Sequence, residues 1–191
     1  MAVLSEEQTM LRDMAREWTT NESPVTAFRK FRDLAPACGY DANAFKTMAE
    51  MGWAGIVIPE KFGGSDFGWL SLGLVLEETA KTLTASPLAS SALAASALVL
   101  GGSDGAKAAW LPKLASGEAV GTLAIDEGPR HNPAAIATTA TKAGDGWTLS
   151  GTKLVVPAAD EADAFLVPAR LSGAEDSEAG IGLFLVDRAA A

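Results

Sequence analysis

The sequence predicts an α+β fold, with an all-helical N-terminal domain over residues 1–118 and a small, mostly antiparallel β-sheet or barrel domain over residues 119–191. Two observations carry this prediction. Apolar residues recur at helical spacing up to about Gly117, and beyond it they recur with a period close to two, as in strands. The hydrophobic content of 48% is enough to form a core, so we expect the chain to fold.

The first helix is predicted to begin after Ser5, because Gln8 stands three positions further on and completes the pattern of a capping box. One stripe of this helix is apolar and comprises Met10, Leu11, Met14, Ala15 and Trp18. A second helix is predicted between a cap at Asp41 or Asn43 and an end at Gly52.

Pro59 and the pair Gly63–Gly64 interrupt the next apolar run, and we interpret these glycines as a turn rather than a phosphate-binding loop. A third helix is predicted over residues 69–83, with one side formed by Leu72, Val75, Leu76, Thr79, Ala80 and Leu83. Glu77 and Glu78 are adjacent on it and point about 100° apart. They are therefore interpreted as solvated or ion-paired surface rather than an acid/base pair.

A fourth helix is predicted to start with Ser86 as its N-cap and Pro87 as its first helical residue. Its many small side chains allow another helix to approach closely. A fifth helix is predicted over residues 103–117, and Pro112 is expected to kink or divide it.

Three strands are predicted in the second domain, over residues 119–127, 164–170 and 181–188. A hairpin is predicted over residues 134–156, turning at Asp145–Gly146, a pair that supports the left-handed backbone of a tight turn. Pro157 is expected to end its second strand. Residues 171–180 are polar and read as a loop. So few strands leave exposed sheet edges, which suggests that a further covering element is missing.

Composition excludes several classes of function. The net charge of −9 argues against a nucleic-acid binder and against anchoring on an anionic membrane. Cys38 is the only cysteine, so no internal disulfide forms, no multi-cysteine metal site exists, and a reducing, cytoplasmic location is expected. The N-terminus lacks the pattern of a signal peptide, and the longest apolar run is too short to span a bilayer.

The usual catalytic sets are mostly absent. Cys38 and His131 would form a nucleophile and base only if the fold brought them together, and no family signature surrounds either residue. We therefore interpret them as a core thiol and a loop imidazole. The sequence has no zinc-ligand spacing and no P-loop.

Four stretches, in this order, resemble the acyl-CoA dehydrogenase family over nearly the whole chain. "LSEEQTMLRDMAREW" is similar to the opening helix of that family, and "MAEMGWAGIVIPEKFGGSDFGWLSLGLVLEETAKTL" to its most recognisable N-terminal run. "AAWLPKLASGEAVGTLAIDE" is similar to the passage into the β-domain. "GWTLSGTKLVVPAADEADAFLVPAR" is similar to the strands that follow. No single motif is decisive, but four at the right spacing are quite specific.

The resemblance implies an FAD-dependent oxidoreductase of fatty-acid and lipid degradation. In such enzymes a glutamate removes the α-proton of an acyl-CoA thioester while the flavin accepts the β-hydride. It also implies a dimer or tetramer, and electron-transferring flavoprotein as a possible partner. The catalytic glutamate of the family lies in a second helical domain that this chain lacks. The resemblance therefore assigns no catalytic residue here.

The resemblance places FAD contacts on two segments, with Leu123, Ile125 and Asp126 in the first and Val155, Val156 and Pro157 in the second. It places a substrate contact on Asn132. Several of these residues depart from the family pattern. Asp126 stands where a threonine or serine bonds the flavin, Val155 replaces an indole, and Pro157 replaces a threonine. His131 and Asn132 stand where the family has a glycine and a serine. Each lost contact weakens flavin binding by about 1 kcal/mol.

Three hypotheses follow. The chain is the N-terminal part of an FAD-dependent acyl-CoA dehydrogenase, or a flavin-deficient partner subunit of a heteromeric one that processes bulky, sterol-type side chains. As a third possibility, it is an acyl-binding module without redox activity, its pocket lined by the small-residue helix over residues 86–100. Acyl-chain specificity depends on a few pocket side chains that the sequence does not place.

Overall fold

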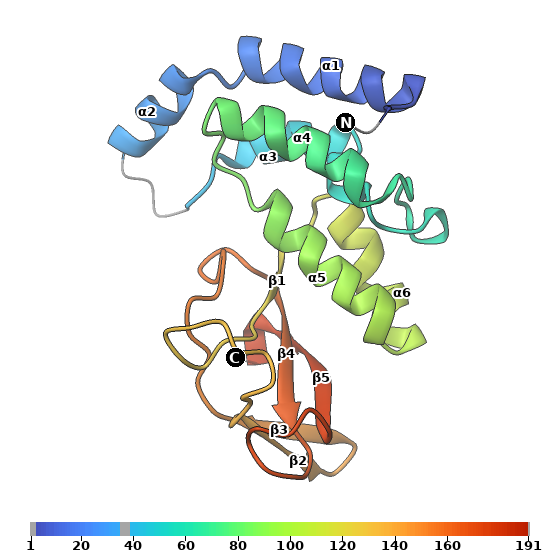
Figure 1. Cartoon of the computed structure of the whole chain (residues 1–191), viewed down its shortest axis with the longest axis vertical. Helices are drawn as coiled ribbons and strands as arrows, with labels where there is room; N and C mark the ends of the chain where they lie inside the picture. Colours follow the sequence, from blue (N-terminus) through green and yellow to red (C-terminus); the bar gives the residue numbers. More distant parts are fainter. Residues whose placement is uncertain (1–2, 35–38, 191) are drawn as a thin grey trace.

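The computed structural model describes residues 3–34 and 39–190 (Figure 1). Within them the helices come first and the strands follow, which confirms the α+β class. The α-helices are α1 (Glu6–Asn21), α2 (Val25–Asp33), α3 (Ala42–Glu50), α4 (Gly68–Lys81), α5 (Leu88–Gly101) and α6 (Asp104–Ala115). The strands are β1 (Gly121–Leu123), β2 (Thr139–Ala143), β3 (Gly146–Ser150), β4 (Ala164–Arg170) and β5 (Ile181–Asp187). Three short 3₁₀ turns are η1 (Trp53–Gly55), η2 (Glu60–Phe62) and η3 (Arg188–Ala190).

Helix α1 begins as expected. The Ser5 hydroxyl accepts a hydrogen bond from the Gln8 amide, and the Gln8 side chain accepts one from the Ser5 amide. Its buried stripe is narrower than predicted. Leu11, Ala15 and Trp18 face the core, whereas Met10 and Met14 are exposed because the neighbouring helix α4 covers only one side of α1.

Helix α2 was not anticipated, because a basic and aromatic stretch of nine residues carries only a weak helical signal. It has no fully buried residue, although its apolar residues recur at helical spacing. Helix α3 starts where the sequence suggested, and of the two candidate caps it is Asp41 whose carboxylate accepts bonds from the Asn43 and Ala44 amides. Gly52 follows α3 with φ of 79°, as a helix end requires.

Helix α4 buries Leu72, Val75 and Thr79, but Ala80 and Leu83 are exposed, so the predicted stripe is too long. The glutamate pair is ion-paired, as one of the two interpretations had it, but Glu78 is not at the surface, because its side chain is only 3% exposed. Burial alone raises the pKa of Glu78, but hydrogen bonds from Arg16 and Lys81 outweigh this effect and lower the pKa. Glu78 therefore ties α1 to α4.

Helices α5 and α6 differ from expectation at one proline each. Pro87 is the N-cap of α5 rather than its first residue, because its ψ of 13° is not helical, and Ser86 caps nothing. Pro112 lies inside α6 without dividing it. It lacks an N–H and so removes one intrahelical hydrogen bond, but the helix continues to Ala115.

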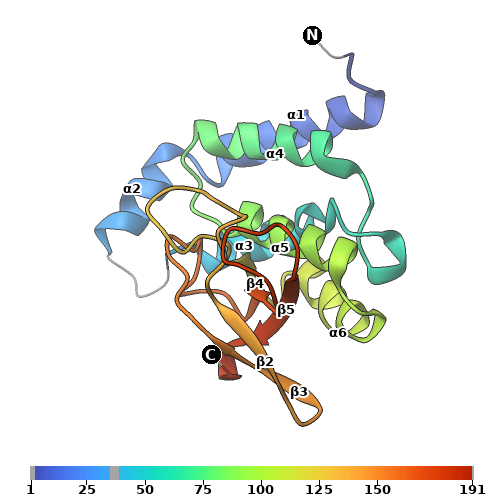
Figure 2. The same ribbon diagram turned by 60° about the horizontal axis from the view of Figure 1, so that its bottom comes forward.

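The sheet has the strand order β1-β4-β2-β3, and β5 also pairs with β4. The pairs β2–β3 and β4–β5 are antiparallel, whereas β4 is parallel to β1 and meets β2 in parallel at a single pair, Thr139 and Arg170. The sheet is therefore mixed, with most of its ladder antiparallel. Figure 2 shows the β2–β3 hairpin extending away from the helices.

Three details of the β-domain differ from prediction. The left-handed residue of the hairpin turn is Gly144, with φ of 57°, because Gly146 already pairs with Ala143 in the ladder. Strand β3 ends at Ser150, so residues 151–156 are irregular and Pro157 does not end a strand. The predicted first strand is also short, since it leaves the sheet after Leu123.

Helix α5 joins the two parts of the chain. It packs against β1 (Figure 1), and the Ser91 hydroxyl accepts a hydrogen bond from the Gly121 amide at 3.2 Å. A Cβ on Gly121 would lie 2.9 Å from the Cβ of Ala94, so glycine allows this close contact. The hydrophobic core continues across this junction. One buried cluster includes Leu98, Leu114 and Leu166, from helices and sheet together.

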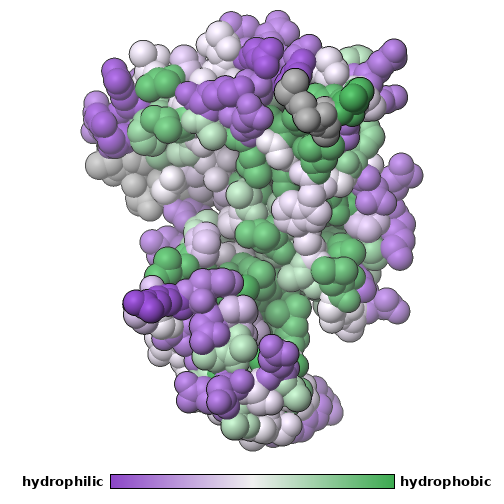
Figure 3. All heavy atoms as spheres, viewed as in Figure 1, coloured by the Kyte–Doolittle hydropathy of each residue, from purple (hydrophilic) through white to green (hydrophobic). Residues whose placement is uncertain are grey.

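Hydrophobic residues also reach the surface along the middle of the molecule, between the outer helices and the sheet (Figure 3). Leu93 and Leu100 of α5 are exposed, as are Trp69 and Leu70 of α4. None of the helices in the described part of the chain is long and apolar enough to cross a membrane.

Candidate functional site

The structure brings together the two segments to which the sequence assigned cofactor contacts. The Leu154 amide donates a hydrogen bond to the Asp126 carbonyl at 2.7 Å. The Thr122 hydroxyl donates one to the Pro157 carbonyl at 2.6 Å. Lys153 Nζ reaches the Ile125 carbonyl at 3.1 Å. The segments 122–127 and 153–158 therefore lie side by side at the edge of the β-domain.

Glu127 and Lys153 form the buried centre of this contact. Lys153 Nζ lies 2.6 Å from Glu127 Oε1, and both side chains are about nine-tenths buried. The Glu127 carboxylate also accepts bonds from the amides of Ala137 and Thr138. Burial alone raises the pKa of Glu127, but these hydrogen bonds, led by the one from Lys153, lower it to about 2. The pair holds both segments to the start of β2.

Asp126 turns toward its own loop. Its carboxylate lies 3.0 Å from Nδ1 of His131 and accepts a bond from the Asn132 amide at 3.2 Å. The hydrogen bond with His131 is the main cause that lowers the pKa of Asp126. His131 is exposed apart from this contact. The negative charge that the sequence places at Asp126 therefore has a local partner.

Pro157 contributes no hydrogen-bond donor, and the side chain of Val155 contributes none either. Val155 is 83% exposed, and its φ of 52° lies in the left-handed region, which is costly for a β-branched residue. Ala158 has φ of 51°. Pro157 has no N–H, and its carbonyl already accepts from Thr122. The residues between β3 and β4 thus store backbone strain at an exposed apolar position.

This strain leads to a testable expectation. Replacing Val155 with asparagine, which tolerates the left-handed region, should raise the free energy of unfolding by about 1 kcal/mol. Urea denaturation followed by circular dichroism measures the change. Val156→Asn is the matched control and should bring no gain, because Val156 is half-buried and has no positive φ. Equal or lower stability of Val155→Asn would contradict the strain argument.

Asn132, the predicted substrate contact, lines a polar cleft of about 270 Å³. Glu127, Gly128, Pro129, Arg130, Ala135 and Glu175 form the rest of its lining. One wall is the loop that leaves β1, and the other is the loop between β4 and β5. Asn132 therefore lies next to the two paired segments, and its contact with a substrate stays a prediction.

The remaining predicted residues have mixed surroundings. Leu123 pairs with Leu166 in the sheet and packs on its core, whereas Ile125 and Val156 are half-buried. Ile125 faces Lys153 only through its carbonyl. None of these three side chains has a polar atom with which to bind a ligand.

The side chains of the two segments do not fit a flavin held through hydroxyl, indole and amide groups. Asp126 presents a carboxylate that His131 and Asn132 already engage. Val155 presents only methyl groups, and Pro157 has no amide hydrogen. A carboxylate beside the ring also opposes the charge that a flavin gains on reduction. The match to the family's cofactor site is therefore in the backbone, not in the side chains.

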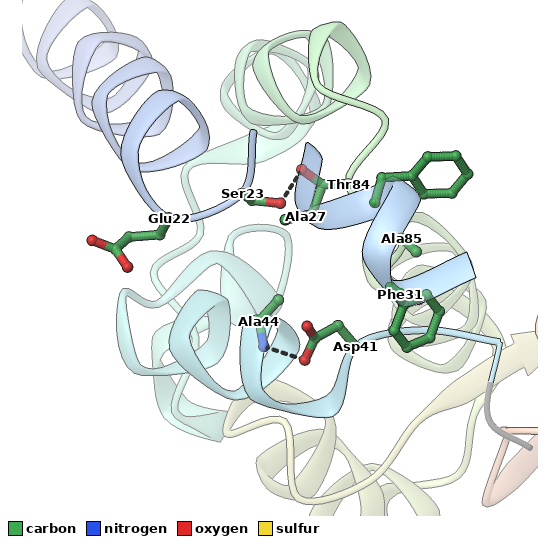
Figure 4. A pocket seen from close by; sticks show the side chains of 9 residues that line it. Glu22, Ser23, Ala27, Phe31, Asp41, Ala44, Thr84 and Ala85 are labelled. Carbon is green, nitrogen blue, oxygen red and sulfur yellow. Dashed lines mark hydrogen bonds between the residues drawn. The ribbon is translucent and has the colours of Figure 1, made fainter. Parts of the chain in front are cut away.

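A second hollow lies among the helices, below α2 (Figure 4). Its volume of about 30 Å³ is room for roughly one water molecule. Figure 4 shows two hydrogen bonds among its lining residues: Ser23 bonds to Thr84, and Asp41 caps α3 through the Ala44 amide. So small a hollow has no room for a flavin or an acyl-CoA, so it is not the functional site.

Other candidates carry nothing further. The described residues contain no group of three or more histidine, cysteine or acidic side chains that could hold a metal ion. Cys38 lies outside the described residues, so its hypothetical pairing with His131 stays untested. His131 instead pairs with Asp126.

Sequence reasoning missed two contacts of the site. Thr122 bonds to Pro157 across 35 positions of the chain, and Asp126 bonds to His131 within a loop. Loops carry no periodicity, so no pattern in the sequence indicated either contact. The buried ion pair of Lys153 and Glu127 was not predicted either.

Comparison with known proteins places the chain. The family model for the N-terminal domain of acyl-CoA dehydrogenase matches residues 5–118, and the model for the middle domain matches residues 124–191. The chain is 33% identical to (2S)-methylsuccinyl-CoA dehydrogenase of Cereibacter sphaeroides, over 97% of this chain and 34% of that protein. It is 32% identical to glutaryl-CoA dehydrogenase of Desulfococcus multivorans, over 96% of this chain and 48% of that protein.

Solved structures agree. A variant of the Tcur3481-Tcur3483 steroid ACAD superposes with a TM-score of 0.82 at 33% identity, covering 95% of this chain and 48% of that one. The ChsE4-ChsE5 complex of Mycobacterium tuberculosis superposes with a TM-score of 0.82 at 26% identity, and the match covers 98% of this chain and 49% of that one. The chain spans half or less of each of these relatives. It belongs to the acyl-CoA dehydrogenase family, of which it carries the N-terminal and middle domains.

Proposed function

We propose that this chain is the flavin-deficient subunit of a two-subunit acyl-CoA dehydrogenase. In this assembly a partner subunit of the same family provides the FAD contacts and the glutamate base. The assembly performs α,β-desaturation of an acyl-CoA thioester, with FAD as the hydride acceptor. This chain contributes binding surface for the acyl-CoA and stabilises the partner.

One observation carries the proposal. At the two paired segments, Asp126 is engaged within its own loop and Pro157 within the contact to Thr122. Val155, the remaining position, offers an exposed apolar side chain in a strained conformation. The fold of a flavin site is thus retained while its side-chain donors are lost. A protein that keeps the scaffold without the donors serves assembly better than chemistry.

The relatives support the same conclusion. A structure titled as a steroid ACAD of two named components and a structure titled as the ChsE4-ChsE5 complex both resemble this chain. By analogy we propose a bulky, sterol-type acyl group as the substrate. A chain in a structure titled as electron transferring flavoprotein of Acidaminococcus fermentans also matches this chain, at 26% identity. We accordingly propose electron-transferring flavoprotein as the acceptor of electrons from the assembly.

Asn132 is the residue we assign to the substrate in this proposal. It lies in the polar cleft beside Glu127 and Glu175, where its amide can donate to and accept from a polar arm of the thioester. The carboxylate of Glu127 is committed to Lys153. It therefore has no role as a base.

A second function has an observation in its favour. Glu127 and Lys153 form a buried ion pair that holds the two segments together, as a bound flavin would require. On that ground the chain is the N-terminal half of a complete flavoprotein that binds FAD once its C-terminal helical domain is present. The two functions differ in whether this chain contacts FAD.

Purification decides between them. The proposal predicts a protein without flavin absorbance near 450 nm when the chain is made alone. It predicts a yellow complex, active on acyl-CoA, when the chain is made together with a partner subunit encoded beside it. Stoichiometric FAD on the chain alone would contradict the proposal. FAD that is bound only when a C-terminal helical domain follows this chain, without any partner subunit, would favour the second function.

A further inference from the structure

Arg170, the last residue of β4, is a buried cation bound almost entirely by backbone carbonyls. It is 7% exposed. Its Nε donates to the Ile136 carbonyl at 2.8 Å. The two terminal nitrogens donate to five more carbonyls, those of Ala134, Ser172, Glu175, Ser177 and Ala179, at 2.8 to 3.4 Å. Six acceptors surround five N–H donors, so the whole guanidinium is engaged.

No carboxylate balances this charge at ion-pair distance among the residues that the structure describes. A buried cation without a counterion is costly unless dipoles replace water around it. The six carbonyl oxygens supply those dipoles. Removing the guanidinium would leave them facing one another without donors, so the segments that carry them depend on Arg170 for their positions.

The carbonyls come from the two walls of the polar cleft. Ala134 and Ile136 belong to the loop before β2, and the other four belong to the loop between β4 and β5. The two walls also touch directly, because the Ile136 amide donates to the Glu175 carbonyl at 3.1 Å. Ala135 and Glu175, one from each loop, both line the cleft. Arg170 thus lies behind both walls and binds each of them.

We propose that Arg170 is a positioning residue that sets the separation of the two cleft walls, and so fits the cleft to the polar arm of an acyl-CoA. The identity of the ligand rests on the proposed function; the role in wall position does not. Lysine cannot replace it, since an ammonium has three donors at one point and lacks the planar fork that reaches both loops.

Amide hydrogen exchange of the full chain tests the wall position. In Arg170→Lys and Arg170→Met, the amides of Ile136 and Ser177 should exchange at least roughly tenfold faster, while those within the β4–β5 ladder keep their parent rates. If Arg170 only stabilised the fold, its replacement would accelerate amide exchange in the β4–β5 ladder and in the two walls alike. Equal acceleration, or no change at Ile136, would overturn the proposal.

Arg188→Lys is the matched control. Arg188 also donates to carbonyls, those of Ala159 and Ala162, but at the opposite end of β4. It should leave exchange at Ile136 and Ser177 unchanged. An effect on these two amides as large as that of Arg170→Lys would count against a specific role for Arg170.

Gly180→Ala is a second variant that tests the coupling of the two walls without changing Arg170, in case the Arg170 variants fail to fold. Gly180 has φ of 80°, and a Cβ there would collide with the Ser172 carbonyl oxygen. The substitution therefore displaces one wall while the guanidinium stays in place. Exchange at Ile136, on the other wall, should accelerate as it does in Arg170→Lys. An unchanged Ile136 would show that the walls are independent, which contradicts the proposal.

Calorimetric titration with coenzyme A tests the ligand. The parent chain should bind, and Arg170→Lys should bind roughly tenfold more weakly, whereas Arg188→Lys should match the parent. A parent chain that binds no coenzyme A would refute the ligand assignment, and with it the proposed substrate surface. The exchange experiment would still decide whether Arg170 positions the walls, so the two failures are distinguishable.

Discussion

Lys153→Met is expected to lower the free energy of unfolding by about 3 kcal/mol, because it leaves the Glu127 carboxylate buried without its cation. Urea denaturation followed by circular dichroism measures the loss. The double variant Lys153→Met/Glu127→Gln should recover part of it, since no uncompensated charge then remains. The two paired segments should separate in the single variant, as Lys153 also binds the Ile125 carbonyl.

Lys46→Met is the control for this experiment. Lys46 pairs with Glu50 at 3.8 Å on the surface of α3, and both side chains are mostly exposed. Such pairs contribute about 0.5 kcal/mol or less. If Lys153→Met were no more destabilising than Lys46→Met, the buried pair would not be what holds the site.

The same pair fixes a pH dependence. The pKa of Glu127 in the folded chain is about 2, below its ordinary value of 4.5. Its stabilising contribution is therefore complete above about pH 4.5 and disappears as the pH falls toward 2. A pKa shift of this size corresponds to a stabilising free energy on the order of 3 kcal/mol. Unfolding free energies measured between pH 6 and pH 2.5 should fall less steeply in Glu127→Gln than in the parent chain.

Gly64→Ala is the other change with a large expected effect. The segment after η2 folds back on η1, where the amides of Ser65, Asp66 and Phe67 donate to carbonyls of residues 55–58. A Cβ on Gly64 would collide with the Ile58 carbonyl and lie 2.6 Å from the Gly55 carbonyl oxygen. The methyl group displaces these three bonds, at a cost of at least about 3 kcal/mol.

Gly63→Ala provides the comparison at the neighbouring position. Gly63 has φ of 86° but open space where a Cβ would stand. Alanine there incurs only the left-handed backbone cost, about 1 kcal/mol. Thermal unfolding of the two variants should therefore separate them clearly, with Gly64→Ala the less stable. Equal melting temperatures would contradict the close approach at Gly64.

The helical domain was largely predictable because its signals are local. Ser5 and Gln8 form the capping box that their spacing predicted, and Asp41 caps α3. The errors arose where tertiary packing decides. Met14 belongs to the apolar pattern of α1, yet the fold leaves it exposed, and Glu78 reads as surface, yet it is buried between two cations.

The site was predictable only in part, for a physical reason. The residues of both segments were identified from their order along the chain, and the structure brings those segments together. Their partners lie in loops, where neither helical nor strand period applies. The bond from Thr122 to Pro157 and the six carbonyls around Arg170 depend on backbone paths that side-chain patterns do not record.

Loss of the flavin-facing donors is the central claim, and the most direct test is FAD binding by the chain alone. Purified chain is incubated with excess FAD, separated from free cofactor by gel filtration, and examined for absorbance near 450 nm. The account predicts no retained flavin for the parent chain, and increased retention for the variant Asp126→Thr/Val155→Trp/Pro157→Thr. One equivalent of FAD retained by the parent chain would contradict it.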